Sequence, residues 1–222
     1  MKSQQNVSPW YRRLLANSRF WILALAVVAS VNIAGFVQLE IPAGSLQIIR
    51  IEQIYGFVSL WLLYLAILAS PLTKVFPKLP GKEAYLHARR AIGVSAFYYA
   101  LLHTVVTFFG QLDGFAGIRY LNHTYDLSLL SGVFALGVLF VMAATSLDWV
   151  VDHMGFKNWK LLHRLVYLAS LALLAHIILI GPHYDNGVTP MGALTYAAAA
   201  LLIVLELLRI RQVIRGRKAK RG

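Results

Sequence analysis

Long apolar segments alternate with short polar connections along the chain. Six of these segments are close to the roughly 20 residues that a helix needs to cross the hydrocarbon core of a bilayer. Glycine, proline or clustered charge marks the connections between them. The pattern predicts an all-α, polytopic membrane protein with a six-transmembrane-helix bundle. Its spans are Phe20–Val37, Ile54–Leu72, Ala91–Phe109, Leu127–Ser146, Leu162–Ile180 and Met191–Leu208.

Composition supports this fold class and excludes several chemistries. Of the 222 residues, 59% are hydrophobic and only 14% are charged, so the bilayer must act as the solvent for most of the chain. The chain has no cysteine, which excludes disulfides, iron–sulfur clusters and covalently attached c-type haem. We expect a basic N-terminal tail (1–19), the transmembrane domain (20–208) and a basic C-terminal tail (209–222).

The basic residues predict the orientation of the bundle. The net charge is +12, and with both termini in the cytoplasm, all but Arg50 and Arg119 of the 21 lysines and arginines lie in cytoplasmic tails and connections. This bias is typical of cytoplasmic loops, so we expect both termini to be cytoplasmic. The basic tails hold the orientation and contact anionic lipid, and they give no reason to expect nucleic acid as a partner.

Two histidines lie deep inside separate apolar segments, where ionisable side chains usually mark function. His103 lies 13 residues after Arg90, and His176 lies 13 residues after His163. If both spans run outward, each imidazole lies about 20 Å from the cytoplasmic surface, at about 1.5 Å per residue. Two imidazoles at one depth can hold a six-coordinate haem iron, which suits an electron carrier. The alternative is a pair of histidines that pack helices or handle protons.

The inner ends of the same two spans carry a second set of candidate residues. His163 has Arg90 as its counterpart, and three interpretations stay open. His163 binds a second haem with His87, one turn before Arg90; or Arg90 and His163 bind haem propionates or a flavin phosphate; or both contact lipid headgroups. Thirteen residues of ideal helix turn about 1300°, so His163 and His176 point about 140° apart unless the helix is irregular.

Sequence runs around these residues resemble a known family. Residues 88–93, followed by Leu102 and His103, are similar to the third span of ferric-reductase-like transmembrane domains. The W-x-x-L-H-R-x-x-Y run at 159–167, with a histidine at 176, is similar to their fifth span. In size and architecture the chain resembles the haem-binding membrane subunits of periplasmic methionine-sulfoxide reductase systems. In place of Arg90, many family members have a histidine.

This resemblance implies ligands, cofactors and partners. His103, His163 and His176 would be ligands of haem b, with one haem expected and a second left open, and FMN is a further cofactor associated with these subunits. Electrons would pass from quinol or a cytoplasmic flavin reductase to a periplasmic reductase catalytic subunit, a molybdenum enzyme. The location would be the cell inner membrane. Gly93, Gly132 and Gly137 would let helices or a flat cofactor approach closely.

The residues and the resemblance together favour a transmembrane electron conduit. Electrons would enter near His163 and Arg90, reach a haem held by His103 and His176, and leave to an outer acceptor. No G-x-G-x-x-G motif is present, so we expect an electron-transfer subunit supplied by a separate donor, and not a self-contained enzyme. One alternative is a cofactor-free transporter or scaffold, although few acidic residues lie in the spans. Another is direct haem-dependent reduction of extracellular ferric iron or oxygen.

Overall fold

The computed structural model describes residues 9–180 and 189–218. Parts of the predicted tails, 1–8 and 219–222, and the connection at 181–188 lie outside the described residues. The described residues form helices and turns with no strand, which confirms the all-α class. Six helices are long and apolar enough to cross a membrane, as the hydropathy pattern predicts.

The spans extend beyond the apolar segments at both ends, because helical turns continue into the polar interface. Two of them change helix type along their length: the third continues into the π-helix η1, and the fifth contains the 3₁₀ turn η2. Short helices α4 (Phe115–Ile118) and α6 (Asp148–Met154) lie between spans. The spans are α1 (Pro9–Glu40), α2 (Ser45–Val75), α3 (Lys82–Val106) with η1 (Thr107–Gln111), α5 (His123–Ala144), α7 (Phe156–Leu162) with η2 (His163–Leu165) and α8 (Val166–Ile180), and α9 (Pro190–Lys218).

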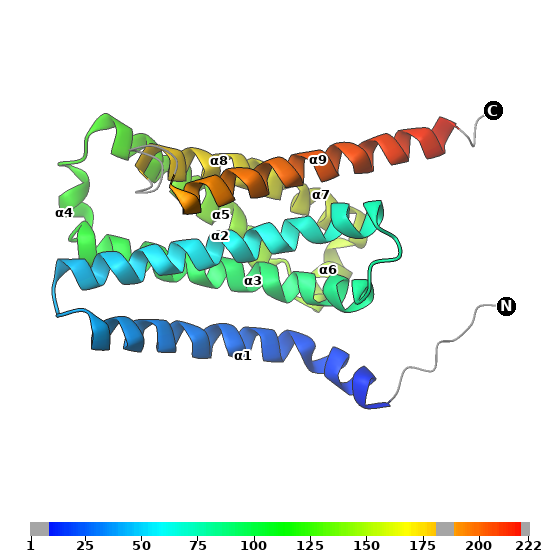
Figure 1. Cartoon of the computed structure of the whole chain (residues 1–222), viewed down its shortest axis with the longest axis horizontal. Coiled ribbons are helices and arrows are strands. Elements are labelled where there is room, and N and C mark those ends of the chain that lie inside the picture. The colour runs from blue at the N-terminus through cyan, green and yellow to red at the C-terminus, as the bar shows by residue number, and fades with distance from the viewer. Residues whose placement is uncertain (1–8, 181–188, 219–222) are drawn as a thin grey trace.

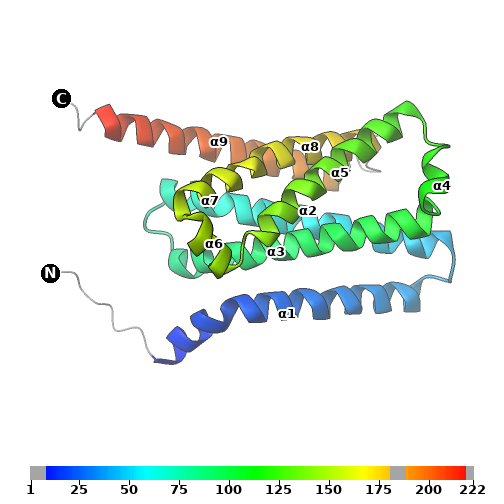
Figure 2. The same ribbon diagram turned by 180° about the vertical axis from the view of Figure 1, so that it is seen from behind.

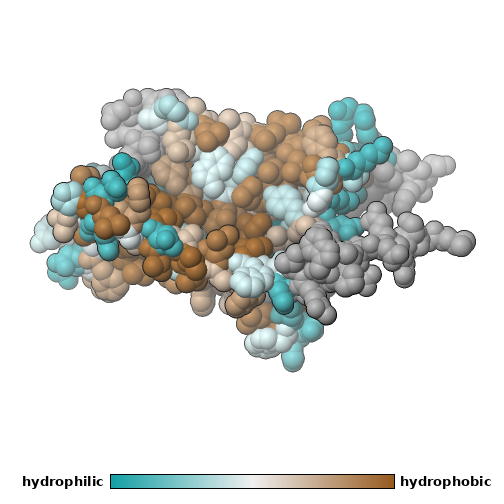
Figure 3. All heavy atoms as spheres, turned by 60° about the horizontal axis from the view of Figure 1, so that its bottom comes forward, coloured by the Kyte–Doolittle hydropathy of each residue, from teal (hydrophilic) through white to brown (hydrophobic). Residues whose placement is uncertain are grey.

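The long helices run back and forth along one common direction (Figure 1). The start of α1 and the end of α9 lie at the same end of the bundle, together with α6 and α7, and α4 lies at the opposite end (Figures 1 and 2). Helices α3 and α8 run in the same direction, as the depth argument for the two histidines requires. Apolar side chains cover the middle of the exposed face, and hydrophilic ones gather toward its ends (Figure 3).

Helix α3 lies at the centre of the packing. One buried cluster joins it to α2, α5 and α8, and a second joins it to α1 and α2. In the second cluster, Tyr99 donates a hydrogen bond to the carbonyl oxygen of Ala26 (3.0 Å), and Tyr55 donates to that of Ser30 (2.8 Å). Alanines with no exposed surface allow the helices to approach closely. The first cluster is Leu63, Ile67, Ala96, Leu139 and Val166.

Two expectations about the connections were wrong. Pro71 was predicted to break the chain after the second span, but it lies buried within α2, which continues to Val75. Transmembrane helices tolerate proline because neighbouring groups satisfy the freed backbone. The stretch Asp148–Lys160 was predicted to be a simple connection, but it forms α6 and the beginning of α7. Its helices carry side chains that the site uses.

Candidate functional site

His103 is held on the outer half of α3 by helix α2. Its Nδ1 lies 3.1 Å from the backbone oxygen of Glu52 and 3.1 Å from that residue's Oε1. The ring packs against Gly56, where an added Cβ would lie 3.1 Å from Nδ1. A glycine at this position therefore gives the imidazole its room, and α2 sets the ring's orientation through Nδ1.

His176 on α8 is held by α5 in a comparable way. Its Nδ1 lies 2.9 Å from the backbone oxygen and 3.0 Å from the Oγ of Ser128, whose hydroxyl is also within 2.9 Å of the His176 carbonyl oxygen. Ser128 has no exposed surface. A Cβ added at Gly132 would lie 2.9 Å from Nδ1, so this glycine also makes room for a ring. The expectation that Gly132 marks a close approach is confirmed.

The two rings lie next to each other. Their centroids are 6.0 Å apart, and their planes are inclined by 84°. Both Nδ1 atoms face protein oxygens, and neither Nε2 makes a hydrogen bond within 9–180 and 189–218. Two metal–nitrogen bonds of about 2 Å, with the distance from each nitrogen to its ring centre, place the centroids about 6 Å apart. The spacing therefore fits two imidazoles on opposite sides of one metal.

The donor set distinguishes a haem iron from a bare metal ion. The part of the chain that the structure describes contains no group of three or more histidine, cysteine, aspartate or glutamate side chains that could hold a metal ion. A porphyrin supplies four nitrogens of its own, so the iron of a haem needs only axial ligands from the protein. Two imidazoles surrounded by apolar helices therefore suit a haem better than a bare ion.

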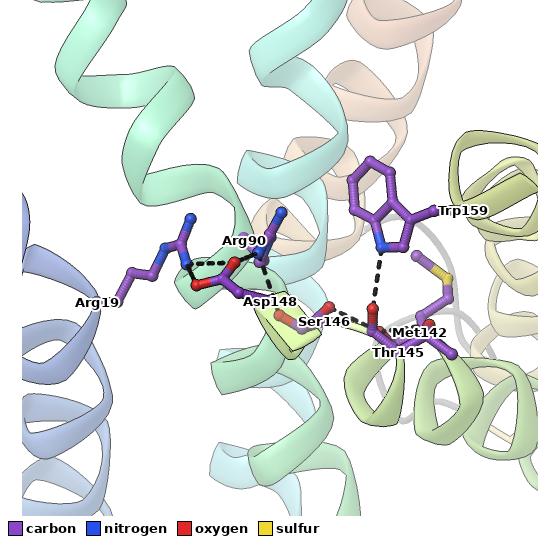
Figure 4. A network of polar contacts seen from close by, with 7 residues as sticks. All are labelled: Arg19, Arg90, Met142, Thr145, Ser146, Asp148 and Trp159. Atoms are coloured by element: carbon purple, nitrogen blue, oxygen red, sulfur yellow. Dashed lines mark hydrogen bonds and ion pairs between the residues drawn. The ribbon is translucent and has the colours of Figure 1, made fainter. Parts of the chain in front are cut away.

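At the inner end, an acidic side chain joins three helices. Asp148 at the start of α6 forms ion pairs with Arg90 of α3 and with Arg19 of α1, whose Nη1 lies 2.8 Å from Oδ2 (Figure 4). Arg90 also donates to the carbonyl oxygen of Ser146 at 3.3 Å. Hydrogen bonds from Arg19 and Arg90 hold the pKa of Asp148 below its ordinary value. Arg90, which was expected to bind an anion, is thus bonded to an anionic side chain of the protein.

Replacing Asp148 with asparagine is expected to lower stability at neutral pH by up to about 1 kcal/mol, because its side chain is 70% exposed and solvent screens such pairs. The lowered pKa means that the contribution is present above the ordinary aspartate value of 3.8 and is lost as the pH falls through the lowered pKa. Unfolding of the detergent-purified protein should therefore differ between wild type and Asp148→Asn at neutral pH and converge in acid. Asp152→Asn on the same helix is the matched control and should match wild type throughout.

Trp159 of α7 contacts both inner candidates. The Arg90 guanidinium lies 5.3 Å from the Trp159 ring centroid, and the His163 ring lies 4.1 Å from it. The Trp159 Nε1 donates to the carbonyl oxygen of Thr145 at 3.0 Å, which joins α7 to the end of α5 (Figure 4). His163 Nδ1 lies 3.1 Å from the Trp159 carbonyl oxygen. The sequence offered no reason to select Trp159 from the other aromatic residues near the histidines.

The helix between His163 and His176 is irregular, which was one of the two alternatives for this span. Residues His163–Leu165 form a 3₁₀ turn. At about 120° per residue, this turn reduces the angular offset between the two histidines from about 140° to about 80°. The interval from Arg90 to His103 is uninterrupted α-helix, so the third span keeps the larger offset.

The remaining predicted pairing is not brought together. His87 is exposed, and it forms no hydrogen bond or ion pair in the described parts of the chain. His163 is half-buried, and its hydrogen bonds go to the backbone of Trp159 and Met142. A ligand role for His87 or His163 therefore stays a prediction. The residues that sequence reasoning missed are Glu52, Gln111, Ser128 and Trp159.

The fold and the site now define a class of protein. Residues 54–174, more than half of the chain, match the family described as "Ferric reductase like transmembrane component". The chain belongs to this family. The match begins in α2 and ends in α8, so it contains His103 and His163, and His176 lies two residues beyond it.

Individual relatives share a more specific name. A Brucella ovis protein named "Protein-methionine-sulfoxide reductase heme-binding subunit MsrQ" is 30% identical to the chain over 171 residues, which cover 75% of this chain and 70% of that protein. An Agrobacterium fabrum protein of the same name is 31% identical over 131 residues, which cover 58% of this chain and 57% of that protein. The chain is thus aligned with a little over half the length of the Agrobacterium relative.

Proposed function

We propose that this chain is a b-type haem membrane protein that carries electrons across the cell inner membrane. The observation that carries the proposal is the placement of the His103 and His176 rings, with centroids 6.0 Å apart and both Nδ1 atoms bonded to protein oxygens. The printed name of the relatives, a heme-binding subunit, supports the same cofactor.

In this proposal His103 and His176 are the two axial ligands. Hydrogen bonds at Nδ1 hold each ring in one orientation and leave Nε2 as the ligand atom. When bound, the haem supplies reversible one-electron chemistry. Gly56 and Gly132 keep the space behind the rings open, and the apolar helices exclude water from the site.

The direction and the partners are part of the proposal. The positive charge on the inner tails supports a cytoplasmic location for both termini, which places the two histidines in the outer half of the bilayer. Electrons enter from quinol or a cytoplasmic flavin reductase and leave to an acceptor outside. By the name of the relatives, that acceptor is the catalytic subunit of a methionine-sulfoxide reductase. Reduction of ferric iron or oxygen would use the same site with a different acceptor.

The inner end is the candidate place for FMN or a second haem. Arg90 is the side chain suited to a flavin phosphate or a propionate, because a guanidinium binds such groups through paired hydrogen bonds. To bind either group, Arg90 would exchange its bond with Asp148 for one with the ligand. Trp159, which contacts both Arg90 and His163, offers an aromatic surface beside them.

The test is a cofactor count on the purified, full-length protein. We expect a b-type absorption spectrum that changes on reduction, one haem b per chain by pyridine haemochrome, and a separate flavin value from extraction of the same sample. A cofactor-free transporter would be colourless. Colourless protein purified in good yield from haem-replete cells would contradict the proposal.

A further inference from the structure

The two histidines differ in the charge of the group behind them. At His103, the Glu52 carboxylate places Oε1 3.1 Å from Nδ1, and both side chains are largely buried, with 17% and 22% of their surface exposed. At His176, Nδ1 meets the backbone oxygen and the hydroxyl of Ser128, which are both neutral. One imidazole therefore has an anionic partner, and the other does not.

Glu52 is itself held in place by the π-helix that follows α3. Gln111, the last residue of η1, donates from Nε2 to the Oε2 of Glu52 at 2.7 Å. The turn lies close against α2 because residue 110 is glycine: a Cβ there would lie 2.6 Å from Cγ2 of Ile48. The π-helix thus places an amide on the carboxylate oxygen that His103 does not use. Such π segments occur frequently at functional sites.

An anion at this position changes the properties of a metal on the other side of the ring. A carboxylate that accepts the Nδ1–H bond fixes the tautomer and makes Nε2 a stronger donor to the metal. Its negative charge also favours the ferric state, which carries one more positive charge than the ferrous state, and solvent screens this attraction little at a buried site. Both effects lower the reduction potential of an iron bound at Nε2.

We infer that Glu52 is a positioning residue that orients His103 and lowers the reduction potential of the iron held by His103 and His176. Gln111 moderates this effect, because its hydrogen bond draws charge toward Oε2 and away from the imidazole. The inference rests on the proposed haem function, and it adds a determinant of the potential that lies on α2, outside the two ligand-bearing helices.

Replacing Glu52 with glutamine tests the charge with little change of shape. The amide oxygen can still accept the Nδ1–H bond, so the variant should retain haem, with a loss of haem affinity no greater than about 10-fold. Spectroelectrochemical titration of the purified protein, at one neutral pH, should give a midpoint potential more positive than that of wild type. Glu206→Gln is the matched control, since Glu206 is a buried carboxylate bonded to Tyr167 and Arg209 of the inner end. Its midpoint should equal that of wild type.

Gln111→Leu supplies a change in the opposite direction. It leaves the Glu52 carboxylate in place without its amide donor, so the midpoint should become more negative. Shifts of opposite sign at Glu52 and Gln111 would not arise from a general loosening of the site. An unchanged midpoint in haem-loaded Glu52→Gln would overturn the inference. If Glu52→Gln does not hold haem, an unchanged or positive shift in Gln111→Leu would overturn it. Failure of the proposed function looks different, because the wild type would then contain no haem.

Discussion

The purified His103→Ala and His176→Ala variants are expected to lose the b-type absorption spectrum of the wild type. Each substitution removes one of the two ligand nitrogens, and the remaining imidazole faces an empty position 6.0 Å away. Loss of outer-shell partners alone costs about 10–100-fold in metal affinity, so loss of a ligand should reduce haem content by more than about 10-fold. The measurement is haem per protein by pyridine haemochrome, after the amount of each variant in the membrane has been matched.

His153→Ala is the control for the ligand variants. It makes the same chemical change in α6, where the exposed His153 has its Nδ1 3.0 Å from the Trp149 carbonyl oxygen, and it should leave the spectrum unchanged. Wild-type haem content in both His103→Ala and His176→Ala would exclude this pair as the haem ligands. Loss of haem in the control as well would point to a general effect on folding.

Gly132→Ala is expected to reduce haem content strongly without touching a ligand. The new Cβ would lie 2.9 Å from Nδ1 and 3.1 Å from Cε1 of His176, which is closer than van der Waals contact allows. The ring must then move away from Ser128, whose oxygens hold Nδ1 at 2.9 and 3.0 Å. Overpacking of this kind costs about 1–3 kcal/mol, which corresponds to about a 10-fold loss of haem affinity at the middle of that range.

Gly137→Ala is the matched control on the same helix. A Cβ added at this position meets no heavy atom within 4 Å. Because alanine also favours helix over glycine, the variant should fold at least as well as wild type and keep its haem. The two variants are compared by haemochrome content and by thermal release of haem. Equal behaviour of Gly132→Ala and Gly137→Ala would show that contact with the His176 ring does not control the site.

The sequence determined the number of spans and the relative placement of the two histidines. Segment length and hydropathy are enough for the first, because a bilayer needs about 20 apolar residues per helix and requires the backbone to bond within the helix. For the second, His103 and His176 follow the inner end of their spans by equal intervals, and α3 and α8 run in the same direction. Their rings consequently meet, at a centroid separation of 6.0 Å.

The groups behind the rings were decided by the tertiary structure alone. Glu52 and Ser128 lie 51 and 48 residues from the histidines that they contact, and Gln111 reaches Glu52 only because η1 has π geometry. Similarly, the 3₁₀ turn at His163 sets the direction in which that side chain points. Depth in the membrane follows from counting residues along one helix. Contacts across helices depend on how each helix is rotated about its axis, and the packing of its neighbours sets that rotation.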